Sequence, residues 1–232
     1  MPDHSLSALP LTHLVIDCDG VLIDSEAVAL DTLLASLQPR MPDREQLAAL
    51  IRPRLGLSLV IVLAQLFEAM DATPADGELA AIAEHIEHEC DRRLSLVPGV
   101  AAALAAIALP KAVASNSHST RVRAALDRTG LAPLFGSRIH TPDNSGHPKP
   151  HPAVYLAAAA GFGVAPGHCI ALEDSITGAT AAVAAGMVVL GYIGGGHVPA
   201  GQALRMQALG VHATFDDMAC LPGLVSTLVR LR

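Results

Sequence analysis

The sequence predicts an α/β fold in which a doubly wound parallel sheet, a Rossmann-like core, carries a smaller all-helical domain. Two observations predict it. From residue 97 onward, short apolar segments alternate with helical patterns, as is typical of a parallel sheet with helices on both faces. Between the first apolar segment and residue 97 the patterns are helical, without a convincing strand, which indicates a helical insertion.

The first strand is expected at residues 14–16, because Leu-Val-Ile is a short apolar run rich in β-branched side chains. A helix should follow from Ser25 to about residue 35, with Asp24 or Ser25 as its cap and two prolines after its end. Further helices of the insertion are expected at residues 46–51, 58–70 and 78–94.

The remaining elements alternate between strand and helix. Strands are expected near residues 112–114, 138–140, 169–172, 187–190 and 212–215, and helices near 100–107, 119–129, 153–160, 177–185 and 221–231. We therefore assign residues 1–24 and 97–232 to the core and residues 25–96 to the helical insertion.

Composition limits the classes of function. Of 232 residues, 51% are hydrophobic, which favours a folded globule over disorder. Aromatic residues make up 3%, Trp is absent and the net charge is −7 without a basic run, so no nucleic-acid partner is expected. Four scattered cysteines and the lack of signal-like or membrane-like stretches predict a reduced, cytoplasmic protein that binds no membrane. We expect a monomer or a weak homodimer.

Two acids directly follow the first strand. Asp17 and Asp19 precede Gly20 at the carboxyl end of the strand, where open α/β sheets bind ligands. One carboxylate can act as the nucleophile of a phosphoryl transfer and the other can hold or deliver a proton, while two close anions favour Mg²⁺. The alternative is a plain turn, in which the acids act as caps and Gly20 supplies an unusual backbone angle.

Three later segments also place polar groups at strand ends. Ser115 and Asn116 precede a helix, where a hydroxyl and free backbone N–H groups can bind an anion; the alternative is a simple helix cap by Ser115, Ser117 or His118. Lys149 stands among three prolines that stiffen its loop, so its ammonium can neutralise a reacting phosphoryl group.

The third segment supplies a second pair of acids. Glu173 and Asp174 follow the strand expected at residues 169–172 and can complete an oxygen shell for Mg²⁺. The alternative is capping of the next helix by Asp174 or Ser175. Four strand ends that each present a suitable group, in one chain, favour the enzyme interpretation.

The run from Leu14 to Glu26 and the three later segments resemble the four motifs of the haloacid dehalogenase (HAD) superfamily of phosphotransferases. By this resemblance Asp17 is the nucleophile and Asp19 the general acid and base. Mg²⁺ is held by Asp17, the backbone carbonyl of Asp19 and Asp174, with Glu173 nearby. The helical insertion corresponds to the cap domain of this superfamily, which closes over the substrate.

The resemblance also assigns the other motif residues. Ser115 binds the transferring phosphoryl group, Asn116 contributes hydrogen bonds nearby and Lys149 neutralises charge. Ala153 stands where many members carry Asp, a departure that weakens local hydrogen bonding more than the role of the lysine.

The overall pattern is similar to bacterial sugar-phosphate and 6-phosphogluconate phosphatases. It implies a Mg²⁺-dependent phosphatase that hydrolyses a small phosphorylated metabolite through an aspartyl-phosphate on Asp17. Within the insertion we expect substrate contacts from Gly56, Ser58, Arg52 and Arg54.

Two alternatives stay open. A β-phosphoglucomutase-like phosphotransferase is disfavoured by Ala29, where the mutases carry a histidine, and by Leu59, where they carry an arginine. A catalytically silent phosphate-binding protein is disfavoured because Asp17, Asp19 and Lys149 are all present.

Overall fold

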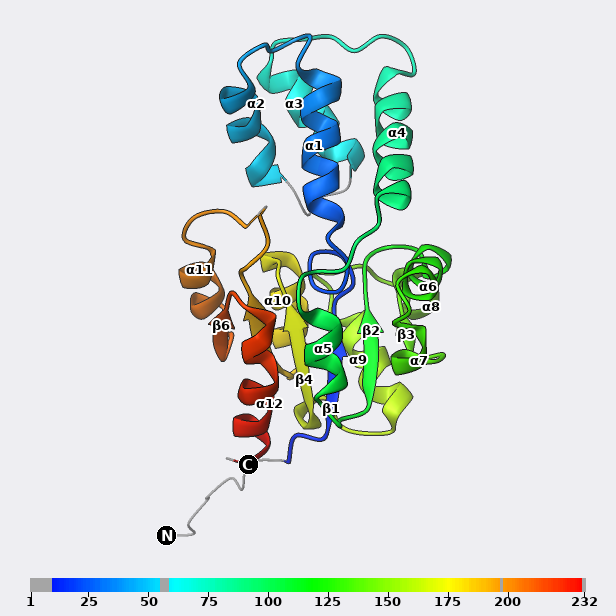
Figure 1. Ribbon diagram of the computed structural model, residues 1–232, viewed down its shortest axis with the longest axis vertical. Coiled ribbons are helices and arrows are strands. Elements are labelled where there is room, and N and C mark those ends of the chain that lie inside the picture. Colours follow the sequence, from blue (N-terminus) through cyan, green and yellow to red (C-terminus); the bar gives the residue numbers. More distant parts are fainter. Residues whose placement is uncertain (1–9, 55–58, 197, 231–232) are drawn as a thin grey trace.

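The computed structural model describes residues 10–54, 59–196 and 198–230, and these residues form two lobes (Figure 1). The lower lobe in that view holds a six-stranded parallel sheet with the strand order β3-β2-β1-β4-β5-β6. The strands are β1 (His13–Ile16), β2 (Lys111–Ala114), β3 (Ile139–His140), β4 (Cys169–Glu173), β5 (Val188–Tyr192) and β6 (Ala213–Phe215). The first strand therefore lies in the middle of the sheet, between β2 and β4.

Helices cover both faces of the sheet, because successive side chains along each strand point to opposite faces. Leu14 and Ile16 of β1 pack on one side and Val15 packs on the other. The first side is covered by α5 (Val100–Ala105), α6 (Ser119–Arg128), α7 (Ala132–Phe135) and α12 (Leu221–Arg230), and the second by α9 (Ala153–Phe162), α10 (Ile176–Ala184) and α11 (Gln202–Ala208). The prediction of a doubly wound parallel sheet is confirmed.

The upper lobe, called the cap from here on, is helical. It comprises α1 (Ser25–Leu37), α2 (Arg44–Ile51), η1 (Arg52–Arg54), α3 (Leu59–Ala69) and α4 (Glu78–Arg92). Its helices enclose an apolar cluster of their own, in which Leu33, Leu63 and Ile86 are fully buried. A helical cap on a Rossmann-like core is thus present, while the division at residues 25 and 96 stays a prediction.

Two chain segments join the cap to the sheet lobe, and they lie side by side. The amide of Asp24 donates a hydrogen bond to the carbonyl of Ser95 at 3.0 Å, and the amide of Val97 donates to the carbonyl of Leu22 at 3.0 Å. Ile23 and Leu96 form an antiparallel bridge between these bonds. The cap therefore begins and ends at one point above the carboxyl end of β1.

The structure differs from the sequence prediction near the edge of the sheet. Strand β5 runs two residues beyond the predicted end, to Tyr192, and α11 follows it although no helix was predicted there. A Cβ at Gly191 would lie 2.6 Å from the sulfur of Met206, so this glycine allows α11 to pack closely on the strand. The short helix α8 (Pro142–Ser145) and the 3₁₀ turns η2 (Pro166–His168) and η3 (Met218–Cys220) complete the fold.

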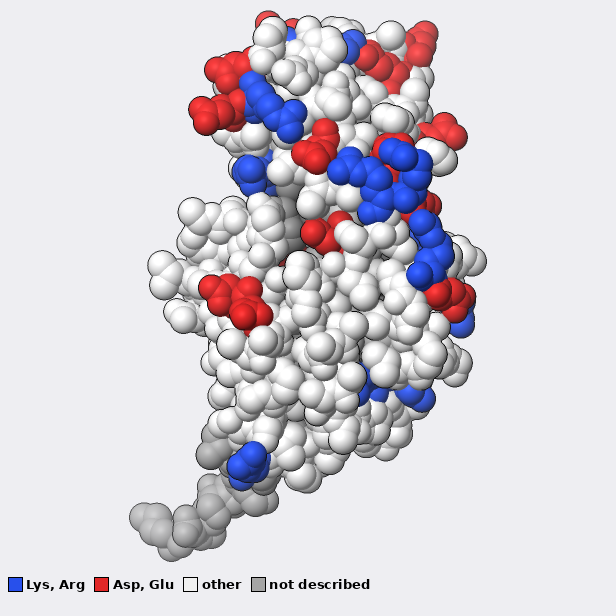
Figure 2. All heavy atoms as spheres, in the orientation of Figure 1, with Lys and Arg blue, Asp and Glu red and all other residues white. Residues whose placement is uncertain are grey.

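Charged side chains are unevenly distributed over the surface. On the face in Figure 2, acidic and basic side chains gather on the cap and at its junction with the sheet lobe, while much of the sheet lobe is uncharged. Within the part of the chain that the structure describes, no helix has both the length and the apolar composition to span a membrane.

Candidate active site

Three polar segments meet at the carboxyl edge of the sheet because β1, β2 and β4 are adjacent and parallel. The fourth segment, with Lys149, does not follow a strand end as predicted; it comes after α8 and reaches the same place from a loop. Strand β1 leads into Asp17, whose amide donates to the carbonyl of Leu172 at 3.0 Å. Strand β4 ends in Glu173 and continues into Asp174, and β2 leads into Ser115. The strand ends were predicted from the sequence, and the structure brings Asp17, Glu173 and Asp174 together there.

Three buried carboxylates form the centre of the site. Asp17, Glu173 and Asp174 each offer an oxygen atom, and these atoms lie within 4.8 Å of one another. Burial raises the pKa of the Asp17 carboxyl well above its usual range; Lys149 opposes the rise, while Glu173 and Asp174 add to it. A cluster of this kind is stabilised by positive charge, and hard oxygen donors are the ligands that Mg²⁺ prefers.

Two glycines leave room for these carboxylates. A Cβ at Gly20 would collide with the carboxylate of Asp174, and a Cβ at Gly178 would collide with that of Glu173. Gly20 also has a φ of +80°, a backbone conformation that L side chains rarely adopt. Gly20 therefore supplies the unusual backbone angle of a turn and also leaves room for the carboxylate of Asp174.

Lys149 supplies positive charge within the protein. Its Nζ lies 2.6 Å from Oδ1 of Asp17 and 2.6 Å from Oε1 of Glu173, and its side chain is 4% exposed. Although burial favours the neutral amine, these two carboxylates raise the pKa of Lys149 above its ordinary value. The lysine is charged in this site and links Asp17 to Glu173 on β4.

Asn116 holds the backbone of Lys149. Its side-chain oxygen accepts a hydrogen bond from the amide of Lys149 at 2.7 Å, and its side-chain nitrogen donates to the carbonyl of the same residue at 3.2 Å. The Lys149–Pro150 peptide bond is cis. Asn116 therefore positions the lysine through its main chain, a contact that the sequence did not indicate.

Tyr155 was not among the predicted site residues. Its hydroxyl donates to Oε1 of Glu173, and the hydroxyl of Ser175 donates to Oε2 at 3.1 Å. Ser175 also caps α10 by accepting a hydrogen bond from the amide of Gly178 at 3.0 Å. The capping alternative considered for the second acid pair thus applies to Ser175, and the acids themselves point into the cluster.

Asp19 lies beside the cluster, toward the cap. Its two carboxylate oxygens accept hydrogen bonds from the hydroxyls of Ser25 at 2.8 Å and Ser117 at 2.7 Å. The guanidinium of Arg121 lies 3.8 Å from the same carboxylate. None of these three partners was predicted from the sequence as a site residue.

Ser115 is 1% exposed and lies at the tip of β2. Its hydroxyl oxygen accepts a hydrogen bond from the amide of Ser117 at 3.0 Å, and its own amide donates to the carbonyl of His140 at 3.0 Å. The N-terminal capping residue of α6 is His118, whose ring accepts a hydrogen bond from the amide of Thr120. Ser115 is therefore not the helix cap.

Of the residues in the helical cap that were predicted to contact the substrate, only some lie in the described part of the chain. Gly56 and Ser58 lie outside the described residues. Arg52 donates to the carbonyl of Gly196 at 2.8 Å, and Arg54 donates to the carbonyl of Leu50 at 2.6 Å. The Nε atom of Arg54 is buried and has no hydrogen-bond partner among the described residues.

One further site residue that was not predicted from the sequence comes from helix α11. Gln202, the first residue of α11, is buried, and its side-chain amide donates to the backbone carbonyl of Asp174. Helix α11 thus fixes the main chain of the second acid pair.

The amino-acid sequence matches a known hydrolase family and several phosphatases. The haloacid dehalogenase-like hydrolase family profile matches residues 11–186. The chain is 27% identical over 177 residues to the 6-phosphogluconate phosphatase of Escherichia coli K12, covering 75% of this chain and 78% of the relative. It is 34% identical over 187 residues to hexitol phosphatase B of the same organism, covering 75% of this chain and 79% of the relative.

A solved structure extends the likeness to the whole fold. A HAD family hydrolase from Deinococcus radiodurans R1, with bound phosphate and sodium, is 29% identical, superimposes with a TM-score of 0.80, and the match covers 94% of this chain and 96% of that one. The profile match and these relatives show that the chain belongs to the haloacid dehalogenase-like hydrolase family, as an enzyme of its phosphatase type.

Proposed function

We propose that this enzyme is a Mg²⁺-dependent phosphatase that hydrolyses a small phosphorylated metabolite of the sugar phosphate or phosphogluconate type. The observation that carries the proposal is the buried Lys149, which lies 2.6 Å from Asp17 and 2.6 Å from Glu173, next to Asp174. Phosphoryl transfer is accelerated mainly by positioning and by neutralising charge, and this site supplies both.

The chain's residues divide the reaction into two steps. A carboxylate oxygen of Asp17 attacks phosphorus and forms an aspartyl-phosphate, while Asp19 gives its proton to the departing alkoxide. Asp19 then takes a proton from water, which attacks the phosphorus and releases inorganic phosphate and free Asp17. Ser115 and Lys149 hold the phosphoryl oxygens during both steps.

The donor set fits a magnesium ion. The oxygens of Asp17, Glu173 and Asp174 are close enough to share one cation, and no nitrogen or sulfur donor joins that group among the described residues. The backbone carbonyl of Asp19 is the further ligand that we propose. Bound Mg²⁺ would neutralise charge on the transferring phosphoryl group.

The relatives support the substrate class. One is named a 6-phosphogluconate phosphatase and another a hexitol phosphatase, and the Deinococcus radiodurans structure contains phosphate. We propose that Arg52 and Arg54 face the substrate, with Gly56 and Ser58, because η1 lies at the start of the segment between α2 and α3.

Release of phosphate from p-nitrophenyl phosphate, 6-phosphogluconate and a hexitol phosphate tests the proposal. We expect turnover with Mg²⁺ and none after chelation. Asp17→Asn should lose on the order of 10³-fold or more in kcat, whereas Asp127→Asn, at an exposed position on α6, should match the parent. Turnover that persists in Asp17→Asn would contradict the aspartyl-phosphate route, and transfer of phosphate between sugar positions without release would favour a mutase.

A second experiment separates the cap arginines from the core chemistry. Arg52→Ala and Arg54→Ala should raise KM for 6-phosphogluconate and leave p-nitrophenyl phosphate turnover nearly unchanged. The reason is that 6-phosphogluconate carries a second anionic group and p-nitrophenyl phosphate does not. Equal kinetics of both variants and the parent across the panel would contradict a substrate role for these residues.

A further inference from the structure

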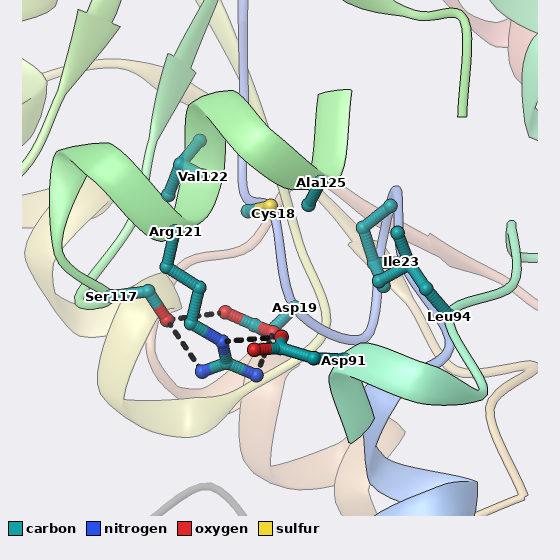
Figure 3. Close-up of a pocket in the computed structure, with 9 residues that line it drawn as sticks. All are labelled: Cys18, Asp19, Ile23, Asp91, Leu94, Ser117, Arg121, Val122 and Ala125. Atoms are coloured by element: carbon teal, nitrogen blue, oxygen red, sulfur yellow. Dashed lines mark hydrogen bonds and ion pairs between the residues drawn. The ribbon is translucent and has the colours of Figure 1, made fainter. Parts of the chain in front are cut away.

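Arg121 is a charged residue that the proposed chemistry does not use, and it lies where the cap meets the sheet lobe. It stands in the first turn of α6, and its side chain is 38% exposed. Figure 3 shows its guanidinium close to the carboxylates of Asp19 and Asp91, which lie side by side, with the hydroxyl of Ser117 on its other side. The ion-pair distances are 3.8 Å to Asp19 and 3.7 Å to Asp91, and the hydrogen bond to Ser117 is 3.3 Å long.

The two carboxylates belong to different lobes. Asp19 follows β1 in the sheet lobe, whereas Asp91 lies near the end of α4 in the cap. Among the described residues that line this pocket, Arg121 is the one cation facing the two acids. The guanidinium lies within 3.8 Å of both carboxylates and offsets the repulsion between these two like charges.

The contacts of Asp19 show what the arginine adds. Ser25 and Ser117 each donate a hydroxyl to Asp19, but a hydroxyl group can rotate and can also donate elsewhere. Arg121 pairs with Asp19 at 3.8 Å and donates a hydrogen bond to the oxygen of Ser117, so it contacts the carboxylate together with one of its two donors. A planar guanidinium orients such partners more rigidly than an ammonium does.

The same network reaches both chain segments that join the lobes. Ser25 is the first residue of α1, and its carbonyl accepts a contact at 3.5 Å from the thiol of Cys90, the residue before Asp91. The segments themselves are paired through Asp24 and Ser95. A displacement of α4 relative to α6 would therefore change the distance between Asp91 and Arg121.

We propose that Arg121 is a positioning residue that orients the carboxylate of Asp19 and, through Asp91, ties that orientation to the position of the cap. The proposal rests on the proposed function, in which Asp19 delivers the proton to the leaving group. It gives the exposed junction in Figure 3 a role in the timing of that step: Asp19 is aligned when α4 lies against α6.

The test uses the dependence of rate on the leaving group. An alkyl phosphate releases a strongly basic alkoxide and needs the proton, whereas p-nitrophenyl phosphate releases a weakly basic phenolate and needs it far less. Arg121→Met should lower kcat for the alkyl phosphate by about tenfold or more, part of the roughly 10²–10⁴-fold that general acid–base catalysis contributes. The loss with p-nitrophenyl phosphate should be under about twofold, and KM should change little for either ester.

Conservative and matched variants complete the first arm. Arg121→Lys should recover part of the lost rate, and Arg123→Met, at an exposed arginine on the same helix, should match the parent. Equal losses on both esters in Arg121→Met, or no loss at all, would overturn the proposal. If the parent hydrolyses neither ester, or if Asp19→Asn leaves the alkyl phosphate rate intact, the proposed function fails instead.

The second arm tests the link to the cap with a double-mutant cycle. Asp91→Asn should lower kcat for the alkyl phosphate in the parent and have no further effect in Arg121→Met, while Glu87→Gln, one turn earlier on α4, changes neither background. Additive losses from the two substitutions, or an Asp91→Asn variant as fast as the parent, would overturn the role of Asp91. Thermal unfolding of each variant separates lost alignment from lost folding.

Discussion

The hydroxyl of Tyr155 donates a hydrogen bond to the carboxylate of Glu173, and both side chains are fully buried. The oxygen that accepts this bond also accepts one from Lys149 at 2.6 Å. Burial raises the pKa of Tyr155 well above its usual range, so the phenol stays a donor at neutral pH. Tyr155 thus restrains Glu173, and Glu173 in turn restrains Lys149.

Tyr155→Phe is expected to lower both stability and turnover. It removes one donor from a buried acceptor, which costs about 1–3 kcal/mol of unfolding free energy, and it frees Glu173 to move with Lys149. Urea unfolding and phosphate release measure the two effects. A Tyr155→Phe enzyme with the parent's stability and kcat would show that the phenol restrains nothing.

Lys149→Met is expected to reduce kcat by about 10²-fold or more, because it removes the preorganised positive charge beside Asp17. Lys149→Arg should not restore the rate, since a planar guanidinium does not fit the place of a compact ammonium.

The chain offers one matched control for that lysine. Lys111, the only other lysine, is also buried, but it donates to the carbonyls of Ile107 and Leu109 at the amino end of β2. Lys111→Met should lower the melting temperature and leave kcat per folded molecule unchanged. Equal loss of kcat in both variants would contradict a specific role for Lys149.

Gly178→Ala is expected to be more harmful than an alanine elsewhere in a helix. Its Cβ would collide with the carboxylate of Glu173, so overpacking should cost about 1–3 kcal/mol and displace that acid from Lys149. Gly223→Ala in α12 meets no atom within 4 Å, and stability there should be equal or higher by up to about 1 kcal/mol. Denaturant midpoints compare the two, and a Gly178→Ala enzyme as stable and active as Gly223→Ala would contradict the expected collision.

His140 predicts a pH dependence of stability. Burial lowers its pKa below the ordinary value of 6.5, so below that pH the unfolded chain binds a proton that the folded protein binds less readily. The contribution of His140 to the free energy of unfolding is therefore fully present above pH 6.5 and is lost as the pH falls through the folded-state pKa. His140→Gln should weaken the decline, whereas His88→Gln, at an exposed position on α4, should not. The measurement is the unfolding free energy of the parent and both variants above and below pH 6.5. An equal decline in the parent and in His140→Gln would contradict the prediction.

The sequence predicted the central strands because they are short apolar runs that end at a turn, as in residues 14–16 of β1 and 169–172 of β4. Parallel strands bring their carboxyl ends to one edge, so the approach of Asp17 to Asp174 followed from topology alone. Helix α11 was missed because it has only seven residues and follows a glycine-rich segment, residues 191–201, that gives no helix signal.

Contacts between distant segments could not be predicted in the same way. Ser117 and Asp19 are 98 residues apart in the chain, and Tyr155 carries no local pattern that distinguishes it from an ordinary core aromatic. Such pairs depend on the distance between packed helices and the rotamers that packing permits, and a single sequence carries little information on either.

The paired segments around Asp24 and Ser95 have a consequence for how such enzymes diversify. Because the chain leaves the catalytic lobe and returns to it at a single seam, an insertion of different length could be exchanged there without moving β1 or the acid that follows it. New substrate preferences can then arise in the exchanged part while the phosphoryl chemistry beneath it stays the same.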